Sequence, residues 1–172
     1  MSNVNRIQPN MREMLIEQSL ACGFDAIGFA SVPQDIDFAL FDSIQPFRSA
    51  IVGLFRPHLP AQDNQGMVGS TDEAYGQISV MACERDYHRY VRERLERFSN
   101  FLQDTWPQCV CGIYTDSPYF NDKTFAVMAG LGHIGANSLL IHPTLGSRVF
   151  IGYIGTTIDP HYWGIEAPLA KP

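Results

Sequence analysis

The 172-residue sequence lacks a long apolar run, and this absence excludes one class of protein. A helix that crosses a membrane needs about 20 consecutive apolar residues, and no segment of the sequence approaches that length. The first residues, MSNVNRIQPNMREM, also lack the apolar stretch of a signal peptide. The sequence therefore predicts a cytoplasmic protein without a membrane anchor, and its length predicts one domain.

Basic residues are scarce as well. The 12 Lys and Arg residues are outnumbered by 18 Asp and Glu residues, which gives a net charge of -6. Because nucleic-acid binding needs a basic surface that neutralises phosphates, this balance argues against nucleic acid as the main ligand. The stretch from Arg85 to Arg97 is the single candidate for a local basic face, and it leaves a tRNA-directed role open.

Cysteine is rare and lacks the spacing of a metal site. The four cysteines show no C-x2-C-x2-C pattern of an iron–sulfur cluster. Cys109 and Cys111 form a C-x-C pair, and on a strand both side chains would face the same side. Two interpretations stay open: two small buried apolar side chains, or zinc or redox use, for which no histidine cluster at ligand spacing is present.

Hydrophobic periodicity predicts helices that interleave with about five strands. Helices are expected over residues 11–22, 86–106 and 121–129, the second with one apolar stripe. Strands are expected over residues 24–30, 49–55, 109–115, 138–141 and 148–156. A turn over residues 143–146 would join the last two strands as a hairpin. The pattern predicts an α+β fold in α/β-type layers.

Three other parts of the chain are expected to lie outside regular structure. Residues 1–10 resemble a flexible leader, and residues 11–158 form the single domain. The proline-containing segment over residues 159–172 is expected to be an extended or loosely ordered tail. Residues 33–45 are ambiguous, with a helical turn as one interpretation, and residues 56–73 form a long loop of the kind that is usually functional or mobile.

Chemical information concentrates between Asp116 and Arg148, in DSPYFNDKTFAVMAGLGHIGANSLLIHPTLGSR. Gly130, Gly132 and Gly135 follow one another at tight spacing, which indicates a sharp turn or a close approach of the backbone to a flat, bulky group. No Gly-Lys-Ser/Thr follows, which excludes a P-loop. The GLGHIG motif opens onto an apolar, strand-like run where a dinucleotide fingerprint needs a helix. The segment therefore predicts a ligand other than a phosphate.

Several side chains are candidates for chemistry. Asp116 follows a strand and precedes aromatic residues, and desolvation among those rings would suit its carboxyl to donate a proton; the alternative is a turn or helix cap. Tyr87 is expected in the core, whereas His88 lies one position off the apolar stripe and faces either solvent or a pocket. His133 stands inside the glycine cluster. Arg148 either clamps an anionic group or caps the turn.

These motifs together resemble a known family. The segment MAGLGHIGANSLLIHPTLGSRVFIGYIGT resembles the cobalamin-site segment of epoxyqueuosine reductases, whose pattern is AGLGxxGKNxLLIxPxxGS followed by an aromatic strand. The block ERDYHRYVRERL is similar to that family's RDYH block, and FDAIG and RSAIV resemble its FDxxG and R-S-x-I-V elements. The resemblance covers most of residues 14–158. A more distant likeness extends to reductive dehalogenases, which share the AGLG and P-x-x-G elements.

The resemblance implies a fold, a cofactor and a reaction. Family members reduce the epoxide of epoxyqueuosine in tRNA to queuosine, and hold cobalamin in a nitroreductase-like domain, here expected as a mixed sheet flanked by helices. Asp116 matches the family's proton donor, and the acid and base that follow align with Asp122 and Lys123. The cofactor-binding residues implied are Gly130, Gly132, His133, Gly135, Asn137, Ser138, Pro143, Gly146 and Arg148.

The sequence also departs from the family pattern. The lysine of the family's G-K-N is Ala136, although Asn137 remains, and the usual tryptophan before I-G is His133. The family's threonine–aspartate pair on the last strand is Thr156–Thr157. Ala136 also removes a cation that the family places near the site. Because no cysteine-rich module that could reduce the cobalt follows in the given sequence, corrinoid binding is expected to survive better than catalysis.

The given sequence also contains no cysteine-rich module up to Pro172. The resemblance then implies that electrons come from a separate ferredoxin-like donor, with tRNA as a second partner. Two alternatives remain open. One is a corrinoid carrier or processing protein without turnover, and the other is an FMN-binding, nitroreductase-like protein.

Overall fold

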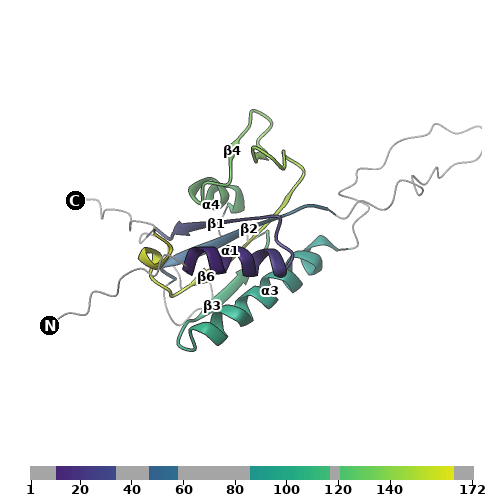
Figure 1. Cartoon of the computed structure of the whole chain (residues 1–172). Helices are drawn as coiled ribbons and strands as arrows, with labels where there is room; N and C mark the ends of the chain where they lie inside the picture. The colour runs from purple at the N-terminus through teal and green to yellow at the C-terminus, as the bar shows by residue number, and fades with distance from the viewer. Residues whose placement is uncertain (1–10, 34–46, 58–85, 117–120, 165–172) are drawn as a thin grey trace, which may run out of the picture.

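The computed structural model describes residues 11–33, 47–57, 86–116 and 121–164 (Figure 1). The predictions for residues 1–10 and 165–172, and for most of residues 33–45 and 56–73, lie outside these ranges. The described elements are α1 (Met11–Ala21), β1 (Ala26–Ser31), β2 (Ser49–Phe55), α3 (Tyr87–Thr105), β3 (Cys111–Tyr114), α4 (Asp122–Met128), β4 (His133–Ile134), β5 (Leu140–Ile141), β6 (Phe150–Thr156) and the 3-10 helix η3 (Pro160–Trp163).

The central sheet has the strand order β1-β2-β6-β3. Every pairing in it is antiparallel: β1 with β2, β2 with β6 and β3 with β6. The α+β fold class is confirmed, but the expectation of a mixed sheet is wrong for the described strands. β6 runs opposite to both of its neighbours, and this direction removes any parallel pair.

Both faces of this sheet are covered, and Figure 1 shows α1 and α3 on one side and α4 with β4 on the other. β2 is buried at every position from Ser49 to Phe55. Its odd-numbered residues Ile51 and Phe55 join the cluster under α1 and α3, whereas Val52 and Leu54 join the cluster under α4. Burial on both faces explains why this strand has a continuous apolar run and not an alternating one.

The predicted stripe of the long helix is confirmed. Val91, Leu95, Phe98 and Leu102 of α3 are fully buried against the sheet, and each such burial contributes about 1.5–3 kcal/mol. The helix begins after Asp86, whose side chain accepts from the His88 backbone N–H. The cap places His88 in the first turn of α3. This turn lies at the end of the sheet that also carries Asp116.

The predicted hairpin between the last two strands is wrong. β5 pairs with β4 in a separate two-stranded sheet, and β6 lies between β2 and β3. Buried residues on β6 face both sides, with Ile154 in one cluster and Tyr153 in the other. A strand that is apolar on both faces belongs in the middle of a sheet. β5 has only two residues, so pairing with it would leave most of the seven residues of β6 without a neighbouring strand.

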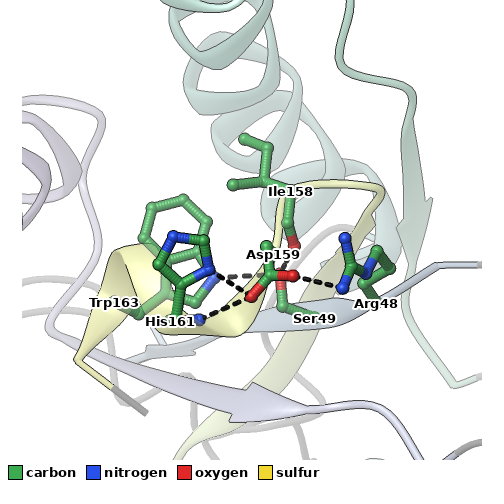
Figure 2. A network of polar contacts seen from close by, with 6 residues as sticks. All are labelled: Arg48, Ser49, Ile158, Asp159, His161 and Trp163. Atoms are coloured by element: carbon green, nitrogen blue, oxygen red, sulfur yellow. Dashed lines mark hydrogen bonds and ion pairs between the residues drawn. The ribbon is translucent and has the colours of Figure 1, made fainter. Parts of the chain in front are cut away.

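The expectation of a loose tail from residue 159 onward is wrong for the residues that the structure describes, which reach residue 164. Residues Pro160–Trp163 form η3, and Trp163 is 1% exposed within the core under α1 and α3. Its indole stacks on the Phe29 ring at 5.5 Å between centroids. As Figure 2 shows, its Nε1 donates to Ser49 Oγ at 2.9 Å, and Ser49 Oγ donates to the Ile158 carbonyl at 2.7 Å. The core therefore extends to Trp163.

Asp159 fastens η3 to the start of β2. Its carboxylate accepts from the His161 backbone N–H and forms an ion pair with Arg48 (Figure 2). Burial raises the pKa of Asp159, but the His161 backbone and ring and the Arg48 guanidinium outweigh burial, so the net pKa is lowered. The lowered pKa means that the carboxylate is stabilised in the folded state.

We expect Asp159→Asn to reduce stability by less than about 1 kcal/mol at neutral pH, because Arg48 is largely exposed and asparagine still caps η3. The difference in unfolding free energy between the variant and wild type should be fully present above the pKa of an aspartate in the unfolded chain, about 3.9. It should vanish as the pH falls through the lowered pKa of Asp159 in the folded protein. Urea unfolding of both proteins across that range measures it. A difference that grows as pH falls would contradict this assignment.

Candidate functional site

The glycine segment folds as a short hairpin above α4. β4 pairs with β5 through His133↔Ile141 and Ile134↔Leu140. Gly132 has a φ of +152°, and a Cβ there would lie 2.2 Å from the Ile141 carbonyl oxygen. A Cβ on Gly135 would meet the Ile141 side chain at 2.6 Å and Asn137 Oδ1 at 2.9 Å. These two glycines are therefore required by the close packing of the hairpin itself.

Two other predicted glycines have no such neighbour. Gly130 and Gly146 have φ values of +73° and +70°, and a Cβ on either would meet nothing within 4 Å. Gly130 follows Ala129, the C-cap of α4, and Gly146 closes the turn that His142 opens through two backbone hydrogen bonds of 3.0 Å each. Both glycines leave open space beside a left-handed turn, so a bulky group has room to approach the backbone there.

Predicted residues Asn137 and Ser138 shape the turn between β4 and β5. Asn137 Oδ1 accepts from the Leu139 N–H at 3.1 Å, and Ser138 has a φ of +60°. Lys123 Nζ donates to the Ser138 carbonyl at 2.7 Å. An α4 side chain thus supplies a cation to this loop, where the family's own lysine position is Ala136.

Asp116 lies at the carboxyl end of β3, as predicted. Its φ of +49° is in the left-handed region, its backbone N–H donates to Asp122 Oδ2 at 2.9 Å, and its carboxylate is 3.4 Å from His88 Nε2. The side chain of Asp116 is 60% exposed, and the aromatic residues expected beside it, Tyr119 and Phe120, lie outside the described residues. The helix-cap alternative fails for α4, because Asn121 is its N-cap.

His88 faces a carboxylate on each side. Its Nδ1 lies 3.2 Å from Asp86 Oδ1, and its Nε2 lies 3.4 Å from Asp116 Oδ2. The ring is about half exposed and contacts the Tyr87 ring at 4.0 Å, while Tyr87 stacks on Phe150 as the core expectation requires. Sequence reasoning left His88 open between solvent and a pocket, and the structure pairs it with Asp116.

The remaining predicted residues are exposed on or after the hairpin. His133 lies on β4, Pro143 lies in the turn after β5, and Arg148 precedes β6. Sequence reasoning missed His142, whose Nδ1 accepts from the backbone N–H groups of Thr144 and Leu145 at 3.1 and 3.0 Å. The sequence signal for this turn was a histidine, which can accept hydrogen bonds, followed directly by Pro143 and Thr144.

Exposed apolar side chains concentrate around the same loop. Large hydrophobic residues with exposed fractions of 38–47% are Val127, Met128, Ile134 and Leu139. Only three other described large hydrophobic side chains are exposed, and two of them lie on α1. A cluster of this kind is typical of a surface that binds a ligand or partner.

Two kinds of feature are absent from the described residues. They contain no group of three or more His, Cys, Asp or Glu side chains that could hold a metal ion. None of the described helices is both long and apolar enough to cross a membrane.

The fold is shared with two kinds of enzyme of known structure. The epoxyqueuosine reductase of Streptococcus thermophilus superposes with a TM-score of 0.72 and 17% identity, over 95% of this chain and 49% of that chain. An epoxyqueuosine reductase solved with an epoxyqueuosine-modified tRNA stem loop gives 0.64 and 21%, over 87% and 46%. A catabolic reductive dehalogenase gives 0.57 and 16%, over 93% and 20%. These enzymes and this chain therefore share one α+β domain fold.

Sequence comparison points to one of these families. The model "Epoxyqueuosine reductase QueG, DUF1730" matches residues 43–117, which include His88 and Asp116 but not the glycine segment. The epoxyqueuosine reductase of Prochlorococcus marinus (strain NATL2A) is 36% identical over 168 residues, covering 86% of this chain and 54% of the relative. That of Synechococcus sp. (strain RCC307) is 28% identical over 172 residues, covering 88% and 54%. The chain spans about half the length of these relatives, and its resemblance to the epoxyqueuosine reductase family is confirmed.

Proposed function

We propose that this chain forms the corrinoid-binding part of an epoxyqueuosine-reductase-type protein, with cobalamin against the hairpin and Asp116 as the proton donor. The confirmed resemblance supports the reaction class, and the arrangement around α4 supports the placement of the site. A reductase of this kind would receive its electrons from a ferredoxin-like donor. The relative solved with a tRNA stem loop supports tRNA as the substrate carrier.

The first turn of α4 is the observation that carries the proposal. Asp122 accepts from the backbone of Asp116, and the adjacent Lys123 donates to the backbone of Ser138. Two neighbouring residues thus fasten the proton-donor turn and the glycine hairpin to one short helix. Groups that act on one ligand have to be held in a fixed relation, and supporting hydrogen bonds of this kind hold them.

The residues present fit a broad, apolar macrocycle with polar arms. Ile134 and Leu139 offer exposed apolar contact, and the open turns at Gly130 and Gly146 let backbone amides approach the ligand. The Asn137 side-chain amide carries both donors and an acceptor for an amide arm. Bound cobalamin would supply the redox chemistry that protein side chains lack.

His88 is the proposed positioning residue for Asp116. A histidine beside a carboxylate can exchange a proton with it, and His88 Nε2 lies 3.4 Å from Asp116 Oδ2, close enough to orient that carboxyl. Because both side chains are about half exposed or more, the pair contributes little stability, about 0–1 kcal/mol. Its proposed role is therefore to orient and reload the acid after each proton donation.

The basic stretch on α3 is not the tRNA surface that we propose. Arg89 pairs with Glu93, Arg94 donates to the Tyr90 carbonyl, and Arg97 donates to the Cys22 carbonyl. These three side chains are engaged within the domain. Most of α3 lies on the sheet face opposite α4 (Figure 1), and its first turn brings His88 to Asp116. A tRNA substrate would approach from the side that carries Asp116.

Leu139→Asp is expected to weaken cobalamin binding at least tenfold. The substitution places a charge where the macrocycle would cover an apolar side chain worth about 1.5–3 kcal/mol, and 1.4 kcal/mol is a factor of ten in affinity. The Leu139 side chain is 44% exposed, so the fold should tolerate the change. Absorbance titration of cobalamin, checked by calorimetry, measures the affinity.

Leu20→Asp provides the matched control. Leu20 is 58% exposed on α1, across the sheet from the hairpin, and its variant should bind cobalamin as wild type does. Equal weakening by both substitutions, or by neither, would place the ligand elsewhere. A wild-type chain that binds no cobalamin would remove the proposal itself.

A further inference from the structure

The two thiols of the C-x-C pair touch in the folded protein. Cys109 Sγ and Cys111 Sγ lie 3.6 Å apart, beside the core cluster under α1 and α3. Both side chains are free cysteines. Among the described residues, the pair belongs to no group of three or more side chains that could hold a metal ion.

The backbone between the thiols explains their contact. Val110 N–H donates to Thr157 Oγ1 at 3.0 Å, and the Thr157 N–H donates to the Val110 carbonyl at 3.1 Å. These bonds hold the segment extended along the end of β6, and residues two apart on an extended chain face the same side. Cys109 and Cys111 are therefore brought together by the extended backbone that leads into β3.

The two thiols differ in their access to solvent. Cys109 is 9% exposed, whereas Cys111 is partly exposed at the start of the edge strand β3. Burial, followed by the charge of Cys111, raises the pKa of Cys109 to about 12. Cys111 is the thiol that a small reagent can reach, and Cys109 lies behind it within contact distance.

We propose that Cys109 and Cys111 form a reversible redox site, which closes to an intrachain disulfide when a low-molecular-weight disulfide is the oxidant. The Cys111 thiolate attacks the oxidant, forms a mixed disulfide and releases one thiol. Cys109 then gives up its proton, attacks Cys111 Sγ and releases the second thiol. Two protein thiols are oxidised by two electrons, and one small disulfide is reduced to two thiols.

The extended backbone makes this disulfide reversible. Residues two apart on a strand have Cα atoms about 6.4–6.8 Å apart, at the upper limit of about 6.8 Å that a disulfide spans. Most disulfides are shorter than this, so closing the bond favours a shorter distance and loosens the two hydrogen bonds between Val110 and Thr157. A disulfide formed under such tension is reduced readily by thiols, which suits a sensor better than a permanent brace.

Glutathione disulfide and mass spectrometry test the proposal on the full chain. Residues 98–123 form a tryptic peptide that contains Cys109 and Cys111 and neither of the other cysteines. In glutathione buffers of increasing oxidation, we expect this peptide to lose two hydrogen atoms without gaining glutathione, and dithiothreitol should reverse the change. Hydrogen exchange at the Thr157 amide should accelerate severalfold in the oxidised protein.

Three variants assign the steps. Cys109→Ser should accumulate a stable glutathione adduct on Cys111, Cys111→Ser should leave Cys109 unmodified, and Cys22→Ser should still form the disulfide. If wild type retains both thiols, or stops at the glutathione adduct as Cys109→Ser does, the pair is only two buried apolar side chains and the proposal is overturned.

Discussion

Asp116→Asn is expected to lower reductive turnover about 100- to 10,000-fold, the usual contribution of a general acid, while cobalamin affinity changes by no more than a few-fold. Asparagine adopts the left-handed φ of +49° at this position as readily as aspartate. The backbone N–H that donates to Asp122 is also kept. The substitution therefore removes the acidic proton and leaves the turn in place.

The measurement uses protein loaded with cobalamin, a chemical reductant and RNA that contains epoxyqueuosine. Asp104→Asn, an exposed carboxylate in the last turn of α3, is the matched control and should keep wild-type turnover. An Asp116→Asn variant as active as this control would mean that Asp116 only shapes the turn. A wild-type protein that binds cobalamin without any turnover would favour the non-catalytic carrier.

Trp163→Ala is expected to lower the free energy of unfolding by about 3–5 kcal/mol, the usual cost of removing a large buried aromatic side chain. Trp163 is 1% exposed, stacks on Phe29 and meets Trp106 edge-on at 6.1 Å between centroids. The loss should appear in urea unfolding as a lower midpoint with a similar slope.

Trp163→Phe separates packing from hydrogen bonding. Phenylalanine keeps most of the aromatic contact but loses the Nε1 donor to Ser49 Oγ, a bond worth about 1 kcal/mol. Tyr162→Ala, a partly buried neighbour on η3, should cost less than Trp163→Ala. A Trp163→Ala loss below about 1 kcal/mol would mean that η3 is dispensable for the core.

Local patterns predicted the elements whose burial is set by their own residues. The apolar stripe of α3 and the continuous apolar run of β2 each match one kind of burial, so periodicity was sufficient for them. Asn121 likewise marked the start of α4 correctly, whereas the C-cap is Ala129, one residue before the predicted Gly130. In these cases the information lies within a single segment.

Pairing between strands that lie far apart in the chain could not be predicted from such local patterns. β6 pairs with β2, which lies about 100 residues earlier in the chain, and the short turn over residues 143–146 wrongly favoured a local hairpin. The prolines at the end of the chain suggested a loose tail. Burial of the Trp163 indole in the core instead holds residues Pro160–Trp163 in the ordered helix η3. Both errors came from reading local sequence where tertiary burial decides.

The candidate site divides in a similar way. The position of Asp116 at the end of β3 followed from the strand pattern, but its contacts with His88 and Asp122 join segments that are separate in the chain. Tight glycine spacing indicated either a sharp turn or a close approach to a ligand, and the packing of Gly132 and Gly135 within the hairpin accounts for the first of these. A glycine motif alone does not distinguish these causes, because both demand the absence of a Cβ.

Competitive titration of the wild-type chain with cobalamin and FMN tests the central proposal most directly. The account predicts that about one equivalent of cobalamin binds, with matching absorbance and calorimetric isotherms, and that Leu139→Asp weakens this binding while Leu20→Asp does not. Binding of FMN with no binding of any cobalamin form would contradict the account and favour a flavin protein on the same fold.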